Sequence, residues 1–275
     1  MASGIKDLRS LIERFESSEG AALPQTDITN HSITAIGSVA EKALSSPLLR
    51  EHLAARGIEP WEPHPCAGPE ELSHRDDWSL ALVLSPYKRE VRDLCDSLTP
   101  AVERSGVIDT ILQDESGRRF GINTNVFGAA HAITHLTGGG RPGRCLILGT
   151  GASARSCAVA LHTLYDKLEV GVIGRNPDRM AEIATEFSLV PVEDVEDYAP
   201  DLLINTTTVG ETMDGDLDYP MEEALIAGVR FFDLNNRTSD LQKTALARGC
   251  VTISGVTMQL SVNALRAHVL RRAVS

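Results

Sequence analysis

The chain has 275 residues, of which 42% are hydrophobic and 23% are charged. This is the composition of a folded protein with a substantial core, and the length suits about two domains. The 26 basic and 38 acidic residues give a formal net charge of −12, so the surface would repel nucleic acid and anionic lipid. Aromatic residues make up 4% of the chain, which disfavours a base-stacking platform.

The cysteines and the apolar segments indicate in which cellular compartment the protein is located. Five cysteines are scattered with no C-x-x-C pair, which favours unpaired thiols over a disulfide framework or a zinc knuckle. No apolar run approaches the ~18 residues that a membrane span needs, and the N-terminus lacks the apolar core of a secretion signal. We therefore expect a cytoplasmic protein that binds neither nucleic acid nor a membrane. The oligomeric state stays open, a homodimer included.

In the first half of the chain, apolar spacing predicts helices and short strands. In chain order these are a helix up to about Ser17, a helix over 33–55 interrupted near Pro47, a segment over 60–77 that is mostly loop, a strand over 78–84, a helix over 91–102 and a strand over 107–112.

The sequence pattern changes after the glycine-rich linker at 138–143, where predicted strands begin to alternate with predicted helices. The predicted elements are a strand over 145–148, a helix around 159–164, a strand over 170–173, a helix near 180–187, a strand over 202–204, a helix around Ala224, a strand over 229–233 and a helix over 240–248. This alternation predicts a parallel, doubly wound sheet.

The sequence Gly149-x-Gly151-x-x-Ala154 follows the first of these strands directly and opens a helix. There, the first glycine permits a tight turn, the second lets the backbone approach a pyrophosphate, and the small third residue allows close packing. Ala152 and Ser153 complete the loop and offer backbone N–H groups at the helix N-terminus. An ordinary tight turn is the alternative, but the position favours nucleotide binding.

The end of the next strand indicates which nucleotide is bound. An NAD enzyme usually carries an acidic residue there, whereas this chain has Arg175-Asn176 and, one helical turn on, Arg179. Two arginines suit a 2′-phosphate, so we predict NADP(H) over NAD. The alternative is a pair of solvated surface arginines.

Seven segments in order resemble motifs of the shikimate/quinate dehydrogenase family, and together they span most of the chain. They are Asn30-His-Ser-Ile-Thr34, Val83-Leu-Ser-Pro-Tyr-Lys88, Val107-Ile-Asp-Thr110, Gly121-Ile-Asn-Thr-Asn-Val-Phe-Gly128, the glycine loop, Asn205-Thr-Thr-Thr-Val-Gly210 and Gly255-Val-Thr-Met258. The resemblance implies an α/β fold of two domains. An N-terminal α/β substrate-binding domain would cover 1–124, with a C-terminal helix over 258–275 packing back on it, and a Rossmann-type NADP-binding domain would cover 125–257.

The family reduces a ring ketone with NADPH, using a lysine paired with an aspartate, and Lys88 matches that lysine. A lysine beside a carboxylate can be tuned for proton transfer. This chain has Asn125 where the family has Asp, and Asp109 where the family has Asn. We interpret this as an exchange of carboxylate and amide around Lys88; two independent losses in a decayed site are the alternative.

Other pocket positions differ too. Leu84, Asn236 and Val262 stand where the family has Thr, Tyr and Gln, while Ser32 and Thr34 match the paired serines that hold the substrate carboxylate. On the cofactor side, the resemblance assigns Thr206, Thr207 and Gly255, with Met258 near the nicotinamide. Because apolar groups replace hydrogen-bonding ones, we expect a ring carboxylate with fewer or differently placed hydroxyls, or with an amino group.

Two metal-like patterns are set aside. His131 and His135 are spaced i, i+4 but lack a third ligand, and the acidic run 214–218 has Tyr219 where a calcium loop needs Gly. We therefore predict no metal site. The predicted function is an NADP(H)-dependent oxidoreductase of the shikimate dehydrogenase type acting on a small carboxylate. The alternatives are a catalytically silent NADP(H)-binding sensor or partner protein, and non-redox use of the lysine.

Overall fold

A computed structural model describes residues 2–25, 28, 31–58, 64–209, 222–236 and 238–272. Asn30, Gly210 and the acidic run 214–218 lie outside these ranges. The chain forms two compact units: unit 1 is Met1–Phe127 with Leu260–Ser275, and unit 2 is Gly128–Gln259. Each unit is α/β and has its own sheet.

Unit 1 contains a mixed five-stranded sheet in the order β1-β2-β4-β5-β3. The strands are β1 (Ile33–Ile36), β2 (Leu80–Val83), β3 (Ser97–Leu98), β4 (Thr110–Gln113) and β5 (Arg119–Ile122). β1 runs parallel to β2, while β4 is antiparallel to both of its neighbours. The strands predicted over 78–84 and 107–112 are confirmed as β2 and β4.

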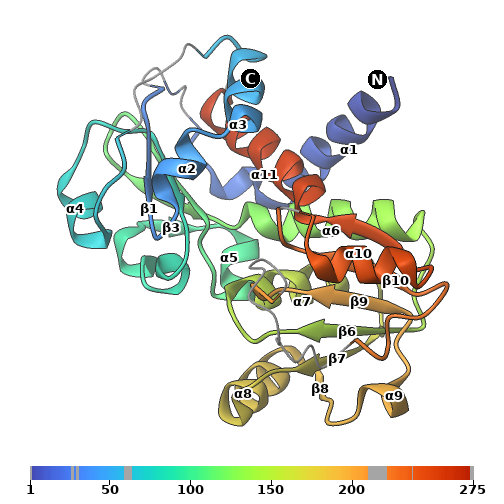
Figure 1. The fold of residues 1–275 in the computed structure, drawn as a ribbon. Coiled ribbons are helices and arrows are strands. Elements are labelled where there is room, and N and C mark those ends of the chain that lie inside the picture. Colours follow the sequence, from blue (N-terminus) through green and yellow to red (C-terminus); the bar gives the residue numbers. More distant parts are fainter. Residues whose placement is uncertain are drawn as a thin grey trace. The chain divides into compact units, whose positions relative to one another are not determined.

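Helices surround this sheet. They are α1 (Ala2–Glu19), α2 (Ala40–Leu44), α3 (Pro47–Ala54), α4 (Pro69–His74), α5 (Pro100–Ser105), the start of α6 (Thr124–Thr137) and the end of α11 (Gly255–Leu270). The last part of α11 lies beside α1 (Figure 1), where Glu16 accepts hydrogen bonds from Arg272 and pairs with His268. The Phe15 and Phe127 rings meet edge to face with centroids 5.2 Å apart.

Two predictions for this half were wrong. The helix predicted over 33–55 begins as the fully buried strand β1, and only α2 and α3 within it are helical. The segment 91–102 holds a 3-10 turn (Arg92–Leu94), β3 and α5 instead of one helix. In both cases a short apolar run fits helical and strand spacing alike, and burial in the folded protein decides between them. The segment 60–77, predicted to be mostly loop, contains the short helix α4.

Unit 2 contains six parallel strands in the order β11-β10-β9-β6-β7-β8. They are β6 (Arg144–Leu148), β7 (Glu169–Ile173), β8 (Val190–Pro191), β9 (Leu202–Asn205), β10 (Arg230–Asp233) and β11 (Val251–Ser254). Renumbered within the unit, this is the 3-2-1-4-5-6 order of a Rossmann fold. The predicted doubly wound sheet is confirmed, and the neighbouring strands can be followed in Figure 1.

The helices of unit 2 alternate with these strands. They are the rest of α6, α7 (Ala152–Leu164), α8 (Pro177–Phe187), α9 (Val195–Tyr198), α10 (Asp240–Ala247) and the first residues of α11. The predicted helix around Ala224 is absent from the described residues 222–229, which form turns that end at Gly228 with φ +88°.

Candidate active site

Lys88 lies in unit 1 just beyond the C-terminal end of β2. The 3-10 turn Tyr87–Arg89 carries it, and the backbone carbonyl of Lys88 accepts a hydrogen bond of 2.8 Å from the Ile108 N–H. This bond ties the lysine segment to the strand that leads into Asp109. The Lys88 side chain is half-buried, and among the described residues it has neither a hydrogen bond nor an ion pair.

Asp109 is fully buried, and its carboxylate lies at the N-terminus of α6. The backbone N–H of Thr124 donates to Oδ1 at 3.0 Å, and that of Asn125 donates to Oδ2 at 2.7 Å. The Thr124 hydroxyl and the Thr110 hydroxyl donate as well. The Asp109 carboxylate therefore caps the N-terminus of α6, with four donors on its two oxygens.

Asn125 follows at the first turn of α6, and its backbone N–H contacts the Asp109 carboxylate. Its side chain is buried and makes no hydrogen bond to the part of the chain that the structure describes. The Asn125 amide is thus available to a ligand, whereas the Asp109 oxygens are engaged.

A second cation, which sequence reasoning missed, is buried beside Asp109. Arg266 on α11 is 6% exposed; its Nε donates to the Thr110 hydroxyl and its Nη2 to the Asp109 backbone carbonyl, both at 3.1 Å. The Oδ1 of Asn263, one turn earlier, lies 3.5 Å from Arg266 Nη1. The sequence did hold a signal for this residue: Arg266 is the one arginine within a mostly apolar stretch, between Leu265 and Ala267, both of which are buried in the structure.

These charges determine the electrostatics of Lys88. Burial lowers the pKa of the Lys88 ammonium from its ordinary value; the Asp109 carboxylate opposes this and the Arg266 guanidinium adds to it. Burial also lowers the pKa of Arg266, against the attraction of Asp109. A lysine with a lowered pKa gives up its proton more readily, as a proton-transfer group requires.

The other predicted substrate residues of unit 1 are placed on or near β1, β2 and α11. Thr34 in β1 is 1% exposed, and its hydroxyl donates to the His64 carbonyl at 2.7 Å. Ser32 precedes β1 and is half-buried, as is Leu84 after β2, whereas Val262 on α11 is buried. Of the two hydroxyls predicted to hold the substrate carboxylate, that of Thr34 therefore already donates its proton to a backbone carbonyl.

The glycine loop of unit 2 joins β6 to α7. Gly149 has φ +114°, and a Cβ there would lie 2.4 Å from the Thr206 Oγ1, so only glycine fits. Gly151 is the N-cap of α7, and a Cβ there would meet no heavy atom within 4 Å. Ala154 is fully buried, which places its methyl group in the helix–sheet packing. The free N–H groups of the first turn, at Ala152 and Ser153, lie next to the open space at Gly151.

Thr206 and Thr207 follow β9 and face this loop. The Thr206 hydroxyl donates to the Leu148 carbonyl at 2.7 Å, and the Thr207 hydroxyl donates to the Asn205 Oδ1 at 2.7 Å. Both threonines are half-buried. They brace the ends of the two central strands, β6 and β9, where the strand order reverses and ligands of such folds bind.

The predicted phosphate-binding residues follow β7. Arg175 and Arg179 are exposed, and neither side chain makes a hydrogen bond or an ion pair within the described ranges. Asn176 has a structural role, because its Oδ1 accepts the Arg179 N–H at 2.9 Å and caps α8. The two guanidinium groups are therefore the ones available to an anion.

The last predicted residues of unit 2 lie around the start of α11. Gly255 is buried, and a Cβ there would lie 2.0 Å from the Leu234 carbonyl oxygen, so no side chain fits. Met258 is buried one turn later, and Asn236 is exposed. The glycine thus lets β10 and α11 approach closely.

A buried carboxylate organises the same end of the sheet. Asp233, at the end of β10, accepts hydrogen bonds from the side chains of Asn205, Ser239 and Gln242 and from the Asn235 N–H. Burial raises the pKa of Asp233, while these four donors oppose the rise. Because Asn205 also bonds the Val209 carbonyl, Asp233 fixes the loop after β9 through Asn205.

Replacing Asp233 by alanine is expected to lower the free energy of unfolding by about 2–4 kcal/mol, since several buried donors lose their acceptor. Urea unfolding followed by circular dichroism measures this. Asp240→Ala is the matched control: its side chain is exposed and pairs with Lys243, so a change of about 0.5 kcal/mol is expected. Equal losses in the two variants would contradict the role given to Asp233.

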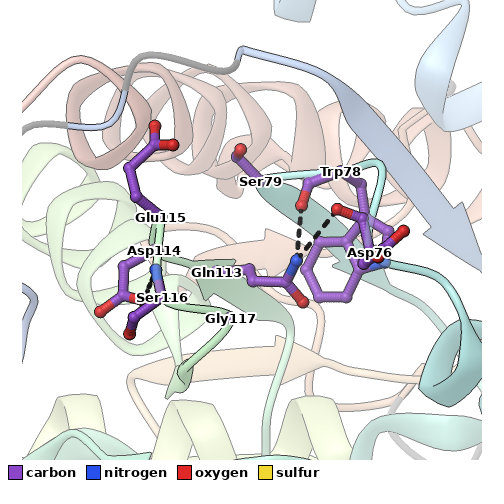
Figure 2. Close-up of a pocket in the computed structure, with 8 residues that line it drawn as sticks. All are labelled: Asp76, Trp78, Ser79, Gln113, Asp114, Glu115, Ser116 and Gly117. Carbon is purple, nitrogen blue, oxygen red and sulfur yellow. Dashed lines mark hydrogen bonds between the residues drawn. The ribbon is translucent and has the colours of Figure 1, made fainter.

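A hollow of about 320 Å³ (Figure 2) is lined by residues next to the start of β2 and the end of β4. Because these strands are antiparallel, Trp78 and Gln113 lie at one end of the pair while Lys88 and Asp109 lie at the other. Gln113 donates to the backbone carbonyls of Asp76 and Trp78 within the hollow. Three acidic and no basic residues line it, so an anionic substrate would be repelled there.

The described residues also lack two features. None of the helices there is long and apolar enough to cross a membrane. The described side chains also form no group of three or more metal-ligating residues.

A Rossmann-ordered sheet with a glycine loop, joined to a second α/β unit that carries a buried lysine site, defines a two-domain α/β protein of the dehydrogenase type. No family model matches the chain. The shikimate dehydrogenase (NADP(+)) of Oleidesulfovibrio alaskensis is 30% identical over 197 residues, 69% of each chain. The chain belongs to the shikimate dehydrogenase family, as the motifs predicted.

Two more comparisons agree with this assignment. The enzyme of the same name from Methanosarcina acetivorans is 31% identical over 174 residues, so the match spans 58% of this chain and 61% of the relative's length. A crystal structure of shikimate 5-dehydrogenase from Thermus thermophilus, in complex with NADP(H) and shikimate, matches with a TM-score of 0.75 and 28% identity. That match covers 87% of this chain and 92% of the other. The predicted two-domain fold with a Rossmann-type domain is confirmed.

Proposed function

We propose that the protein is an NADP(H)-dependent oxidoreductase that interconverts a ring ketone and alcohol on a small carboxylate. The observation that carries this proposal is the Lys88 site: a half-buried lysine with no partner among the described residues, placed next to the buried charges of Asp109 and Arg266. The family relation supports the reaction type. The five cysteines, all unpaired, support a reducing compartment such as the cytoplasm.

The residues of unit 2 fit NADP(H). Gly151 leaves open space at the N-terminus of α7, where N–H groups and the helix dipole favour a pyrophosphate. Arg175 and Arg179 would hold the 2′-phosphate, and Thr206, Thr207, Gly255 and Met258 would border the nicotinamide end. When bound, the cofactor supplies or accepts a hydride.

Lys88 would exchange the proton at the reacting oxygen. In the reduction its ammonium gives a proton to the forming alkoxide, and in the oxidation its amine takes the hydroxyl proton. The Asp109 carboxylate would not contact the substrate, because four donors occupy its oxygens. The Asn125 amide and the Ser32 hydroxyl would orient substrate hydroxyl and carboxylate groups, while Thr34 keeps its proton on the His64 carbonyl.

The test is the change in nicotinamide absorbance at high protein concentration, with NADP+ or NAD+ and a panel of shikimate, quinate and their deoxy and amino analogues. Turnover of any member with NADP+ supports the proposal. The engagement of Asp109 as a helix cap favours one competitor, a cofactor-binding protein without catalysis. That protein would bind NADPH, measured by quenching or calorimetry, and turn over no member of the panel.

Leu84→Thr is expected to raise kcat/KM for shikimate by about tenfold or more, because it restores a hydroxyl where the family has threonine. The assay is the same absorbance change with shikimate as substrate. Leu84→Val is the matched control, since valine has nearly the shape of threonine but no hydroxyl. An equal gain with valine would show that pocket volume, and not hydrogen bonding, limits the reaction.

A further inference from the structure

Arg266 is a buried cation whose bonding partners are all uncharged groups. Its guanidinium donates to the Thr110 hydroxyl, the Asp109 backbone carbonyl and, at 3.5 Å, the Asn263 Oδ1, and it forms no ion pair among the described residues. Removing one cation from water costs several kcal/mol unless polar groups or charge compensate. A simple packing role would be met by an apolar residue, as elsewhere on this face of α11.

Thr110 connects Arg266 to the Asp109 carboxylate. Its Oγ1 accepts the hydrogen bond from Arg266 Nε at 3.1 Å and donates its own proton to Asp109 Oδ1 at 2.8 Å. A second connection runs through the backbone, since Arg266 Nη2 bonds the carbonyl of Asp109 itself. Arg266 therefore holds Asp109 at two points, one on the side chain and one on the main chain.

Within the described part of the chain, few charges act on Lys88. Asp109, before β4, and Arg266, on α11, are the charged groups that affect the pKa of Lys88. The neighbouring Arg89 and Glu90 are also charged, but both are exposed to solvent. Water screens exposed charges but screens buried ones far less. Asp109 and Arg266 are thus the two charges that act on the lysine, and their effects on its pKa oppose each other, with that of Asp109 the larger.

We propose that Arg266 is a positioning residue for Lys88: through Thr110 it fixes the Asp109 carboxylate, and its own charge offsets that carboxylate so that Lys88 releases its proton readily. Without Arg266, Lys88 would face Asp109 alone and would hold its proton more tightly. The lowered pKa of Lys88, to which Arg266 contributes, agrees with this role. The catalytic use of the Lys88 proton rests on the proposed function, whereas the effect of Arg266 on the Lys88 titration does not.

The experiment measures the Lys88 titration directly, without turnover. The intact protein is labelled with trace acetic anhydride from neutral to alkaline pH, and the Lys88 peptide is quantified by mass spectrometry. In Arg266→Gln, we expect the titration to move to higher pH, with labelling at a fixed pH below the midpoint slowed by at least about threefold. Arg266→Lys, which keeps the charge, should titrate close to the parent protein.

Two further variants keep the test decisive. Arg271→Gln removes an exposed arginine of the same C-terminal segment and should leave the Lys88 titration unchanged. Thr110→Val is isosteric and keeps both charges. It removes the Thr110 bond from Arg266, which keeps its bond to the Asp109 carbonyl, and one donor from the Asp109 carboxylate, so a smaller shift in the same direction is expected. If Arg266→Gln does not fold, an unmoved titration in folded Thr110→Val overturns the proposal.

The two proposals fail in different ways. An unmoved titration in folded Arg266→Gln overturns the positioning role even if the protein turns over a substrate. A shifted titration with no turnover on the panel supports the positioning role and contradicts the proposed oxidoreductase.

Discussion

Replacing Lys88 by methionine is expected to lower turnover by about 10²–10⁴-fold, the range that one positioned proton-transfer group contributes. Methionine keeps most of the apolar length of the side chain, and Lys88 has no hydrogen bond that its loss would leave unpaired within the described structure. The fold should therefore survive. The measurement is kcat on the best member of the substrate panel, together with NADPH affinity, which should change less than about twofold.

Arg89→Met is the matched control for Lys88→Met. It removes a positive charge from the adjacent residue of the same 3-10 turn, but from an exposed side chain. Its kcat should stay within about threefold of the parent, because exposed charges act weakly. Similar losses in both variants would mean that the turn binds the substrate through net charge and that Lys88 transfers no proton.

The pH dependence gives a second measure of the same group. Burial and Arg266 lower the pKa of Lys88, so the free enzyme should change its activity at a pH below that of an ordinary lysine. Oxidation of the alcohol, which needs the neutral amine, should rise with pH through that value, and reduction of the ketone should fall. A profile with no step below the ordinary lysine range would exclude Lys88 as the group that titrates.

Periodicity and motif order predicted unit 2 well, because buried parallel strands are continuous apolar runs with glycine at their ends. The strand over 145–148 and the glycine loop that follows it illustrate this. Unit 1 was harder. Ile33–Ile36 is too short for its spacing to distinguish helix from strand, and pairing with β2 across more than forty residues decides the outcome.

At the Lys88 site, less could be predicted from the sequence. Sequence reasoning brought Asp109 and Asn125 together because both lie in motifs, and the structure places them in contact through a hydrogen bond. It could not show that the Asp109 oxygens cap the N-terminus of α6. Nor could it find Arg266, which is separated from Thr110 by 156 positions in the chain and belongs to none of the motifs. Such contacts depend on how α11 packs, not on any local pattern.

The two glycines of the loop before α7 should respond in opposite ways to alanine. Gly149→Ala is expected to lower the free energy of unfolding by about 2–4 kcal/mol, because its φ of +114° is strained for any side chain and the new Cβ would meet Thr206 Oγ1. Thr206 yields only by giving up its bond of 2.7 Å to the Leu148 carbonyl. Urea unfolding of the protein without cofactor measures this loss.

Gly151→Ala should leave that unfolding free energy within about 0.5 kcal/mol, since its Cβ meets no protein atom within 4 Å and its φ of −86° is ordinary. Its NADPH affinity should nevertheless fall by about tenfold or more, because the methyl group would occupy the space through which the pyrophosphate approaches α7. A stable variant with undiminished affinity would place the dinucleotide elsewhere. The pair thus separates the glycine that the fold requires from the glycine that the ligand requires, a distinction that the spacing Gly-x-Gly alone does not make.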